Sequence, residues 1–229
     1  MKVHGAFVVA GLLAGSLFVA GRAASQDAGG EAPKEAPKEA PKEGERKGFR
    51  GADPREYTMP EMMKNMMDSC TPNRFHERLG RHVGEWDLEM TMKGDPAMGG
   101  PMISKGTAKI SWLFPGKFVQ EEIKAAMMGM PFEGRSIMGY NNFKKKYQGI
   151  WVDSMGTSIL SYEGNLGQDG KTMFLTGSMD EPMTGEHDKA VRLITREVGD
   201  DEFHFEMHDL AIGDGDTKVM WIKYTRKKS

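Results

Sequence analysis

The stretch Trp86-Asp-Leu-Glu-Met-Thr-Met-Lys93 alternates apolar and polar residues along its whole length. Successive side chains of a β-strand point to opposite faces, so this pattern predicts a strand that is buried on one face and solvated on the other. Comparable runs follow along the chain, at 107–114, 118–127, 132–140, 147–153, 157–163, 171–178, 190–198, 202–210 and 218–226. Together with residues 86–93, these runs predict ten strands.

Short turns join most of these runs. Pro115-Gly116, Asn141-Asn142, Asp169-Gly170 and Gly199-Asp200 are turn-forming pairs between neighbouring strands, which indicates antiparallel hairpins. Two connections are longer, at residues 94–105 and 180–188. A flat sheet of hairpin-linked strands would leave exposed edges, and closure into a barrel removes them. We therefore predict an all-β fold, an antiparallel up-and-down barrel of about ten strands, with a β-sandwich as the alternative.

Two helical segments are predicted before the strands. Within residues 59–68, methionines recur at helical spacing, at Met59, Met62, Met63, Met66 and Met67. A second helix is predicted to begin near Thr71-Pro72 and to end at Gly84, with an apolar stripe formed by Phe75, Leu79 and Val83. Several strands are apolar on both faces, so we expect these one or two short N-terminal helices to cover part of the outer face.

The first 56 residues differ in composition from the rest of the chain. Residues 1–25 contain an uncharged apolar run followed by Arg22-Ala-Ala-Ser25, the order of a secretory signal peptide with cleavage near Ser25; an uncleaved membrane anchor is the alternative. Residues 26–56 contain Glu-Ala-Pro-Lys three times and predict an extended, solvated linker. We expect an exported protein (periplasmic, cell-envelope or secreted) whose folded domain spans residues 57–229.

Charge and cysteine content limit the classes of partner. The formal net charge is −2 at pH 7, so nothing in the charge balance favours nucleic acid or an anionic membrane surface. We expect no nucleic-acid partner, and no membrane contact beyond the signal segment.

Cys70 is the single cysteine, which excludes a disulfide within the chain. The domain must therefore be held together by its core.

Several separate motifs resemble one bacterial family. They are His76-Glu-Arg-Leu79, Val83-Gly-Glu-Trp-Asp87, Gly129-Met-Pro-Phe-Glu-Gly134, Gly139-Tyr-Asn-Asn142, Trp151-Val-Asp-Ser-Met-Gly-Thr157, Asp180-Glu-Pro-Met-Thr-Gly185 and Tyr224-Thr-Arg226. On these residues, positions 74–227 resemble the domain-of-unknown-function 1579 family. Gly84-Glu-Trp86 also resembles the G-x-W opening of lipocalin-like barrels. That resemblance implies that Trp86 closes one barrel end and packs beneath Arg226, with Gly84 beside them. It implies no activity.

The histidines and methionines raise the question of a metal. His204, Glu206 and His208 would share one face of a strand, but the two histidines would lie roughly 13 Å apart, too far to hold one ion. We interpret them as a solvated outer face, and His76 and His82 as capping or hydrogen-bonding groups near a barrel end. The Met59–Met67 cluster, with Cys70 nearby, favours packing against the barrel or a partner over a copper site. We expect no metal and no cofactor.

One group of side chains is a candidate ligand site. Trp151, Asp153 and Thr157 fall at the end of a strand and the following turn, and with Glu133 and Tyr140 they would line a barrel mouth, where ligand pockets often form. The alternative for Asp153 and Thr157 is ordinary turn structure. No nucleophile elbow, phosphate-binding loop or dinucleotide motif is present in the sequence.

Three hypotheses for function remain after the sequence is read. The leading one is an exported binding protein that holds a small apolar or amphipathic ligand inside the barrel. The second is a structural envelope protein with a filled barrel, which forms a homodimer or binds a partner through the Met59–Met67 helix. The third is a hydrolase or isomerase that uses Asp153 with Tyr140 or with a barrel histidine. We favour binding over catalysis, and assign no catalytic residue.

Overall fold

The computed structural model describes residues 57–94, 100–127, 129–182, 184–213 and 215–228. The predicted signal peptide and linker, residues 1–25 and 26–56, lie outside the described residues. The described part of the chain divides between Asp68 and Ser69 into two compact units.

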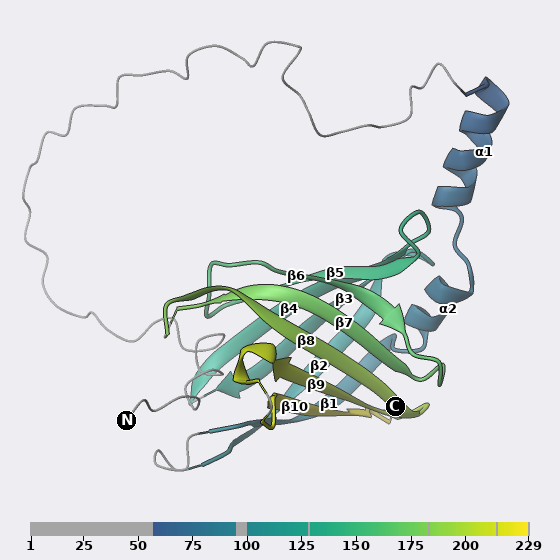
Figure 1. The fold of residues 1–229 in the computed structure, drawn as a ribbon. Coiled ribbons are helices and arrows are strands. Elements are labelled where there is room, and N and C mark those ends of the chain that lie inside the picture. Colours follow the sequence, from purple (N-terminus) through teal and green to yellow (C-terminus); the bar gives the residue numbers. More distant parts are fainter. Residues whose placement is uncertain (1–56, 95–99, 128, 183, 214, 229) are drawn as a thin grey trace, which may run out of the picture. The chain divides into compact units, whose positions relative to one another are not determined.

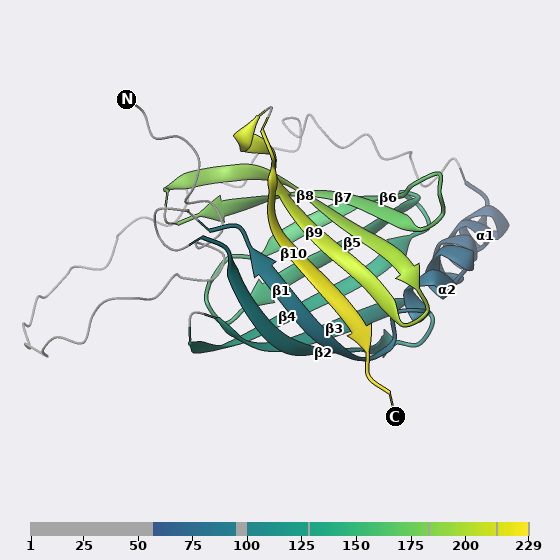
Figure 2. The same ribbon diagram turned by 90° about the horizontal axis from the view of Figure 1, so that it is seen from below.

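The larger unit is a closed antiparallel barrel of ten strands in up-and-down order, in which the last strand pairs with the first (Figures 1 and 2). This confirms the predicted fold. The strands are β1 (Gly84–Met92), β2 (Met102–Phe114), β3 (Phe118–Met127), β4 (Met130–Asn141), β5 (Lys146–Asp153), β6 (Leu160–Leu166), β7 (Thr172–Glu181), β8 (Glu186–Gly199), β9 (Glu202–Asp209) and β10 (Lys218–Arg226), and a 3-10 turn, η3 (Leu210–Ile212), precedes the last of them.

Several strand boundaries differ from the sequence-based prediction. β2 begins at Met102 because it pairs with β1 as far as Met92, so the first long connection is shorter than expected. β7 and β8 likewise continue to the pair Glu181–Glu186. β6 begins only at Leu160, because the Asp153 carboxylate accepts hydrogen bonds from the backbone of the following residues and bends the chain into a loop.

Strand alternation places one face of each strand inside the barrel. On β1, Trp86, Leu88, Met90 and Met92 are buried and the residues between them face outward. The register carries this alternation around the barrel, because neighbouring strands keep paired residues on the same face. The core therefore lies in the interior of the barrel.

The helix α2 (Arg74–Gly80) lies at one end of the barrel (Figure 1). Its N-cap is Asn73, two residues after the predicted start, because Asn73 and His76 form a reciprocal capping box. Leu79 is buried and reaches the interior. The helix thus covers a barrel end, which corrects the prediction that it covers the outer face: its short apolar stripe fits the opening between the strand ends.

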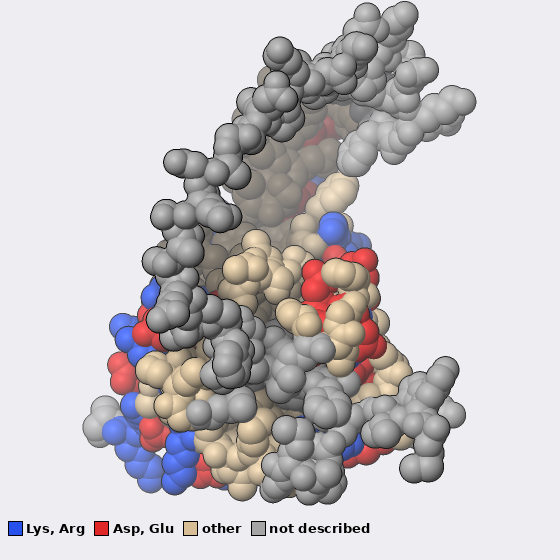
Figure 3. Space-filling model, turned by 90° about the vertical axis from the view of Figure 1, so that its left-hand side faces the viewer, with Lys and Arg blue, Asp and Glu red and all other residues tan. Residues whose placement is uncertain are grey.

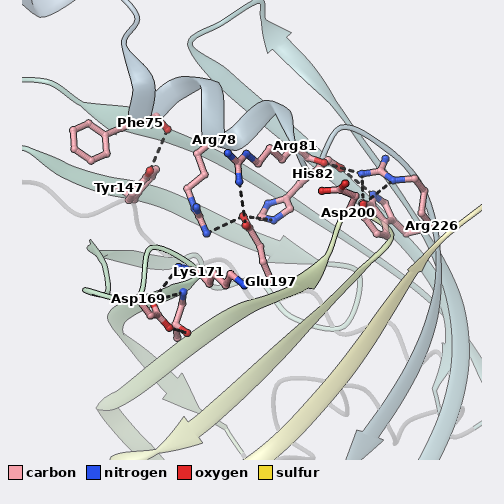
Figure 4. Close-up of polar contacts among 12 residues, drawn as sticks. Phe75, Arg78, Arg81, His82, Tyr147, Asp169, Lys171, Glu197, Asp200 and Arg226 are labelled. Atoms are coloured by element: carbon pink, nitrogen blue, oxygen red, sulfur yellow. Dashed lines mark hydrogen bonds and ion pairs between the residues drawn. The ribbon is translucent and has the colours of Figure 1, made fainter.

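An ion-pair cluster fixes α2 to the strands (Figure 4). The Glu197 carboxylate on β8 lies 2.9 Å from the Arg78 guanidinium, 3.6 Å from that of Arg81 and 3.4 Å from His82 Nε2. Burial raises the pKa of Glu197, but the hydrogen bond to His82 and the charges of Arg78 and Arg81 outweigh that effect and hold the pKa below its usual value. At the same end, the Tyr147 hydroxyl donates to the Phe75 carbonyl.

The first and last strands are locked together at this end of the barrel. The Arg226 guanidinium lies 4.1 Å from the centre of the Trp86 ring and donates to the carbonyls of Val83 and Arg81. Gly84 has a φ of 146°, and a Cβ there would lie 2.4 Å from an Arg226 nitrogen. Glycine is therefore required both by the backbone conformation and by the position of the arginine.

The helix α1 (Met59–Cys70) confirms the predicted methionine-rich helix, and none of its residues is buried. Thr58 and Glu61 exchange hydrogen bonds at its N-terminus, and Lys64 pairs with Asp68 one turn later. Within the part of the chain that the structure describes, no helix has the length and apolar character needed to cross a bilayer.

Candidate functional site

The barrel interior contains a cavity of about 150 Å³. All ten strands contribute to its wall, which is mainly apolar. The apolar lining residues are Leu79, Met90, Ile110, Val119, Ile123, Met127, Phe132, Met138, Trp151, Leu160, Met173, Leu175, Leu193, Phe203, Phe205, Met207, Met220 and Ile222. The polar ones are His82, Glu121, Ser136, Asp153, Tyr162, Thr195 and Tyr224. This is an apolar chamber with a few polar groups, the usual composition of a small-molecule site.

Two glycines make room for the aromatic part of this wall. A Cβ at Gly134 would lie 2.3 Å from the Trp151 ring, and a Cβ at Gly149 would lie 2.5 Å from the Tyr162 ring. Non-bonded atoms do not approach so closely. Each aromatic ring therefore occupies the space that a side chain in place of the neighbouring glycine would need. The positions of Trp151 and Tyr162 in the cavity wall therefore depend on glycine at these neighbours.

Glu121 is one of two acidic residues among the described residues that line the cavity, and the other is Asp153. Glu121 shares the inward face of β3 with Val119 and Ile123 and lines the cavity. The Ser136 hydroxyl donates to its carboxylate over 3.4 Å. Burial raises the pKa of Glu121 to about 7, although hydrogen bonds from Tyr224 and Ser136 work in the opposite direction. Glu121 can therefore exchange a proton close to neutral pH.

Two tyrosines complete this polar group. Burial, followed by the nearby charge of Glu121, raises the pKa of Tyr162 and of Tyr224 above the usual value for tyrosine. Both phenols thus stay protonated, and Tyr224 acts as a hydrogen-bond donor to Glu121. The interior polar group is formed by Glu121, Ser136, Tyr162 and Tyr224, which come from four strands.

The sequence-based site prediction missed Glu121. A signal for it was present, since Val119, Glu121 and Ile123 share one phase of a strand, and a charged residue in an apolar phase marks an unusual environment. The prediction missed this signal because Gln120, Glu121 and Glu122 form one polar run, and such a run is typical of a solvated segment.

The predicted site residues separate in the structure. Trp151 and Asp153 line the cavity, and the Trp151 indole N–H donates to the Asp153 carboxylate over 2.9 Å. Tyr140 lies toward the α2 end, stacked on Phe75 with ring centres 4.5 Å apart. Glu133 is exposed on the outward face of β4, and Thr157 is exposed in the loop before β6. These positions correct the prediction that all five line one barrel mouth.

The histidines of β9 lie outside the barrel. His204, Glu206 and His208 alternate with the inward-facing Phe203, Phe205 and Met207, so the predicted outer-face position is confirmed. Among the described residues, no three histidine, cysteine, aspartate or glutamate side chains are grouped closely enough to hold a metal ion.

The barrel end opposite α2 carries a second buried charge cluster. Lys189 on β8 has a side chain that is 1% exposed, and its ammonium lies 3.2 Å from the buried Asp209 carboxylate and 2.8 Å from that of Glu186. Glu181 on β7 is fully buried at the same end. Figure 3 views this end of the molecule and shows acidic side chains gathered on one part of it. Asp209 also caps η3 by accepting from the Ala211 amide.

Replacing Glu121 by glutamine should stabilise the protein at alkaline pH. The folded-state pKa of Glu121 lies above the ordinary value of 4.5, so the folded state binds the proton more tightly than the unfolded state, and stability falls as pH rises from about 5 through 7. Glu121→Gln removes this loss. We therefore expect the free energy of unfolding to rise by about 2–3 kcal/mol at pH 8 and to change little at pH 5. Urea unfolding at both pH values measures it.

Glu122→Gln is the matched control, because Glu122 lies on the outward face of the same strand and pairs with Arg135 at the surface. It should change stability by less than about 0.5 kcal/mol at either pH. A Glu121→Gln protein whose stability runs parallel to that of the wild type between pH 5 and pH 8 would show that Glu121 does not titrate in this range.

Comparison with known proteins places the chain in a family. Residues 71–226 match the family described as protein of unknown function DUF1579. No curated protein matches the sequence. Among solved structures, the barrel is similar to Rv2717c from M. tuberculosis, at 14% identity and a TM-score of 0.49, over 69% of this chain and 100% of that one. It is also similar to the redesigned β-barrel mFAP0 bound to DFHBI, at 14% identity and a TM-score of 0.33, over 64% and 99% of the two chains.

A second redesigned β-barrel is similar at 13% identity and a TM-score of 0.36, over 66% of this chain and 95% of that one. The match to the family covers all ten strands of the barrel and includes α2. The chain therefore belongs to the DUF1579 family, and its candidate functional site is the cavity inside the barrel.

Proposed function

We propose that this protein binds a small, mainly apolar ligand inside its barrel. The observation that carries the proposal is the cavity of about 150 Å³, with an apolar wall and a buried polar group at Glu121. Burying a carboxyl without a cationic partner in an apolar interior costs stability. That cost is understandable if the group serves a ligand.

The size of the cavity limits the size of the ligand. An engineered apolar cavity of about 150 Å³ in another protein stays dry and binds benzene, whereas pockets for drug-sized ligands are about 300–1,000 Å³. The ligand that fits this cavity without rearrangement is therefore close in size to a substituted benzene.

Toluene provides the direct test. We expect it to raise the melting temperature of the purified full-length protein and to shift the NMR signals of the methionine methyl groups that line the cavity, such as Met90, Met138 and Met207. Unchanged signals of these methyl groups at saturating toluene would overturn the proposal.

A pair of variants on β4 localises the binding. Met138→Trp should fill the cavity and abolish the toluene-induced changes, because Met138 faces inward. Ile137→Trp is the control, since Ile137 is the adjacent, outward-facing residue and is 37% exposed. Equal loss of toluene binding in both variants would show that the effect is not specific to the cavity.

The catalytic alternative receives no comparable support from the geometry. Asp153 pairs with Gly134 across the β4–β5 ladder, and Tyr140 pairs with Tyr147 six positions further along it. Because a strand rises about 3.3 Å per residue, the two side chains are too far apart to act on one substrate atom. The Asp153 oxygens are also used by three donors of its own loop and strand.

Export and self-association remain proposals that rest on the sequence. We propose that the chain is exported and cleaved near Ser25, and the N-terminal sequence of the protein secreted by an expressing cell tests this. We also propose that α1 supports a homodimer, because Met59 and Met63 are exposed on it. Sedimentation of wild-type and Met63→Lys protein tests this, since a dimer through α1 should dissociate in the variant.

A further inference from the structure

The cavity lining contains acidic side chains but no lysine or arginine among the described residues. Among the described residues that line it, the ionisable side chains that can carry a full charge are Glu121, Asp153 and His82, and no lysine or arginine is present. The two cationic residues that face the interior at its ends already have carboxylate partners: Arg78 lies 2.9 Å from Glu197, and Lys189 lies 3.2 Å from Asp209. The chamber thus offers negative charge without a free positive one.

Asp153 and Glu121 differ in how many hydrogen bonds their carboxylate oxygens accept from the protein. One Asp153 oxygen accepts from the Trp151 indole, and the other accepts from the Met155 and Gly156 amides. Its role is to hold the loop after β5. A carboxylate can accept about four hydrogen bonds, and Glu121 has two protein donors, Ser136 and Tyr224. Glu121 therefore keeps acceptor capacity on the side that faces the cavity.

Aromatic rings also line the chamber around this carboxyl. Tyr162 and Tyr224 reach the same polar group as Glu121, and Trp151, Phe203 and Phe205 contribute further rings to the wall. The face of an aromatic ring attracts a cation, and the attraction is strongest where water is excluded. Rings beside a carboxylate are a surrounding that favours an ammonium group.

We propose that the ligand is a compact primary amine with an apolar body, whose ammonium group pairs with Glu121 while its body fills the chamber. This inference rests on the proposed function and narrows its ligand class. A carboxylate ligand such as a fatty acid would meet Glu121 and Asp153 with no free cation to compensate, so the site selects against it. A neutral ligand of the same shape fills the chamber but gains no charge interaction.

The pairing makes amine binding depend on pH. The groups that face Glu121 are Ser136 on β4, Tyr162 on β6 and Tyr224 on β10, and neither phenol ionises near neutral pH. Glu121 must be ionised to pair with the ammonium, so the amine competes with the proton for this carboxyl. With a free pKa of about 7, affinity for the amine should rise about tenfold from pH 6 to pH 8.

Three probes that share a benzene ring test the proposal on the full-length protein: benzylamine, toluene and benzoate. At pH 8 we expect benzylamine to bind at least about tenfold more tightly than toluene, and benzoate to bind more weakly than both. Calorimetry and the methionine methyl signals measure the affinities. If toluene binds and benzylamine binds no better, the amine proposal is wrong and the proposed function stands. If none of the three binds, both fail.

Variants identify the group responsible. Glu121→Gln should weaken benzylamine binding about tenfold or more and remove its pH dependence, and it should change toluene affinity by a smaller factor. The control Glu122→Gln, on the outward face of β3, should alter none of these values. An unchanged benzylamine affinity in Glu121→Gln would overturn the assignment to Glu121. The wild-type pH profile is an independent readout that needs no variant, and a flat profile between pH 6 and pH 8 would contradict the pairing.

Discussion

Replacing Trp86 by alanine should lower the free energy of unfolding by about 3–5 kcal/mol, the range for removing a fully buried aromatic side chain. The Trp86 side chain is only 1% exposed. Its ring lies beneath the Arg226 guanidinium and packs edge-on against Phe203 with ring centres 4.7 Å apart. Its indole N–H donates to the His82 carbonyl over 2.9 Å. Alanine would leave a cavity, an unpaired carbonyl and an arginine without its aromatic partner.

The effect should be specific to this barrel end and not to tryptophan in general. Trp221 is the matched control, because it lies on the outward face of β10 and contacts His204 at the surface. Trp221→Ala should lower the free energy of unfolding by about 1 kcal/mol. Guanidinium unfolding of the two variants measures both effects. Equal losses in the free energy of unfolding would mean that the contact between Trp86 and Arg226 does not hold the first and last strands together.

Replacing Lys189 by methionine should also lower the free energy of unfolding by about 3–5 kcal/mol, because it leaves a buried carboxylate without its counter-charge. The Lys189 and Asp209 side chains are 1% and 2% exposed, and their charged atoms lie 3.2 Å apart. Methionine has nearly the same length as lysine, so the packing changes little. The loss therefore measures the uncompensated charge rather than a cavity.

A double variant separates these two causes. Asp209→Asn removes the unpaired charge with little change in side-chain size, so Lys189→Met/Asp209→Asn should recover part of the loss in free energy of unfolding. Lys218→Met is the control, since Lys218 pairs with Glu206 on the outer face, where an ion pair contributes about 1 kcal/mol or less. A double variant that is no more stable than Lys189→Met would contradict the charge explanation.

Charge clusters lie at both ends of the barrel. The cluster at Glu197 joins α2 to β8 at one end, and the pair of Lys189 and Asp209 lies at the other. Both consist of groups that are costly to bury without partners. Of the two carboxyls among the described residues that line the cavity, Asp153 already accepts from three donors and Glu121 from two, which is the reason for treating Glu121 as the residue that meets a ligand.

Local sequence determined the strands and helices of this protein. Alternation in residues 86–93 and in later runs predicts the ten strands, because the side-chain period of a strand is two wherever one face is buried. The spacing of Met59, Met62 and Met63 predicts α1 for the corresponding reason, the 3.6-residue period of a helix. Short turns between the runs predict the hairpin order, and hence the closed barrel.

Only the tertiary structure decided which face of each strand is inside and which side chains meet there. On β4, Phe132 and Ser136 alternate with Glu133 and Ile137, and this pattern alone does not state which set faces the interior. Glu121 meets Tyr224 because β10 closes on β1, so residues about a hundred positions apart face each other across the chamber. Local periodicity reports that two faces differ, whereas contact across a barrel depends on closure and register, which are properties of the whole chain.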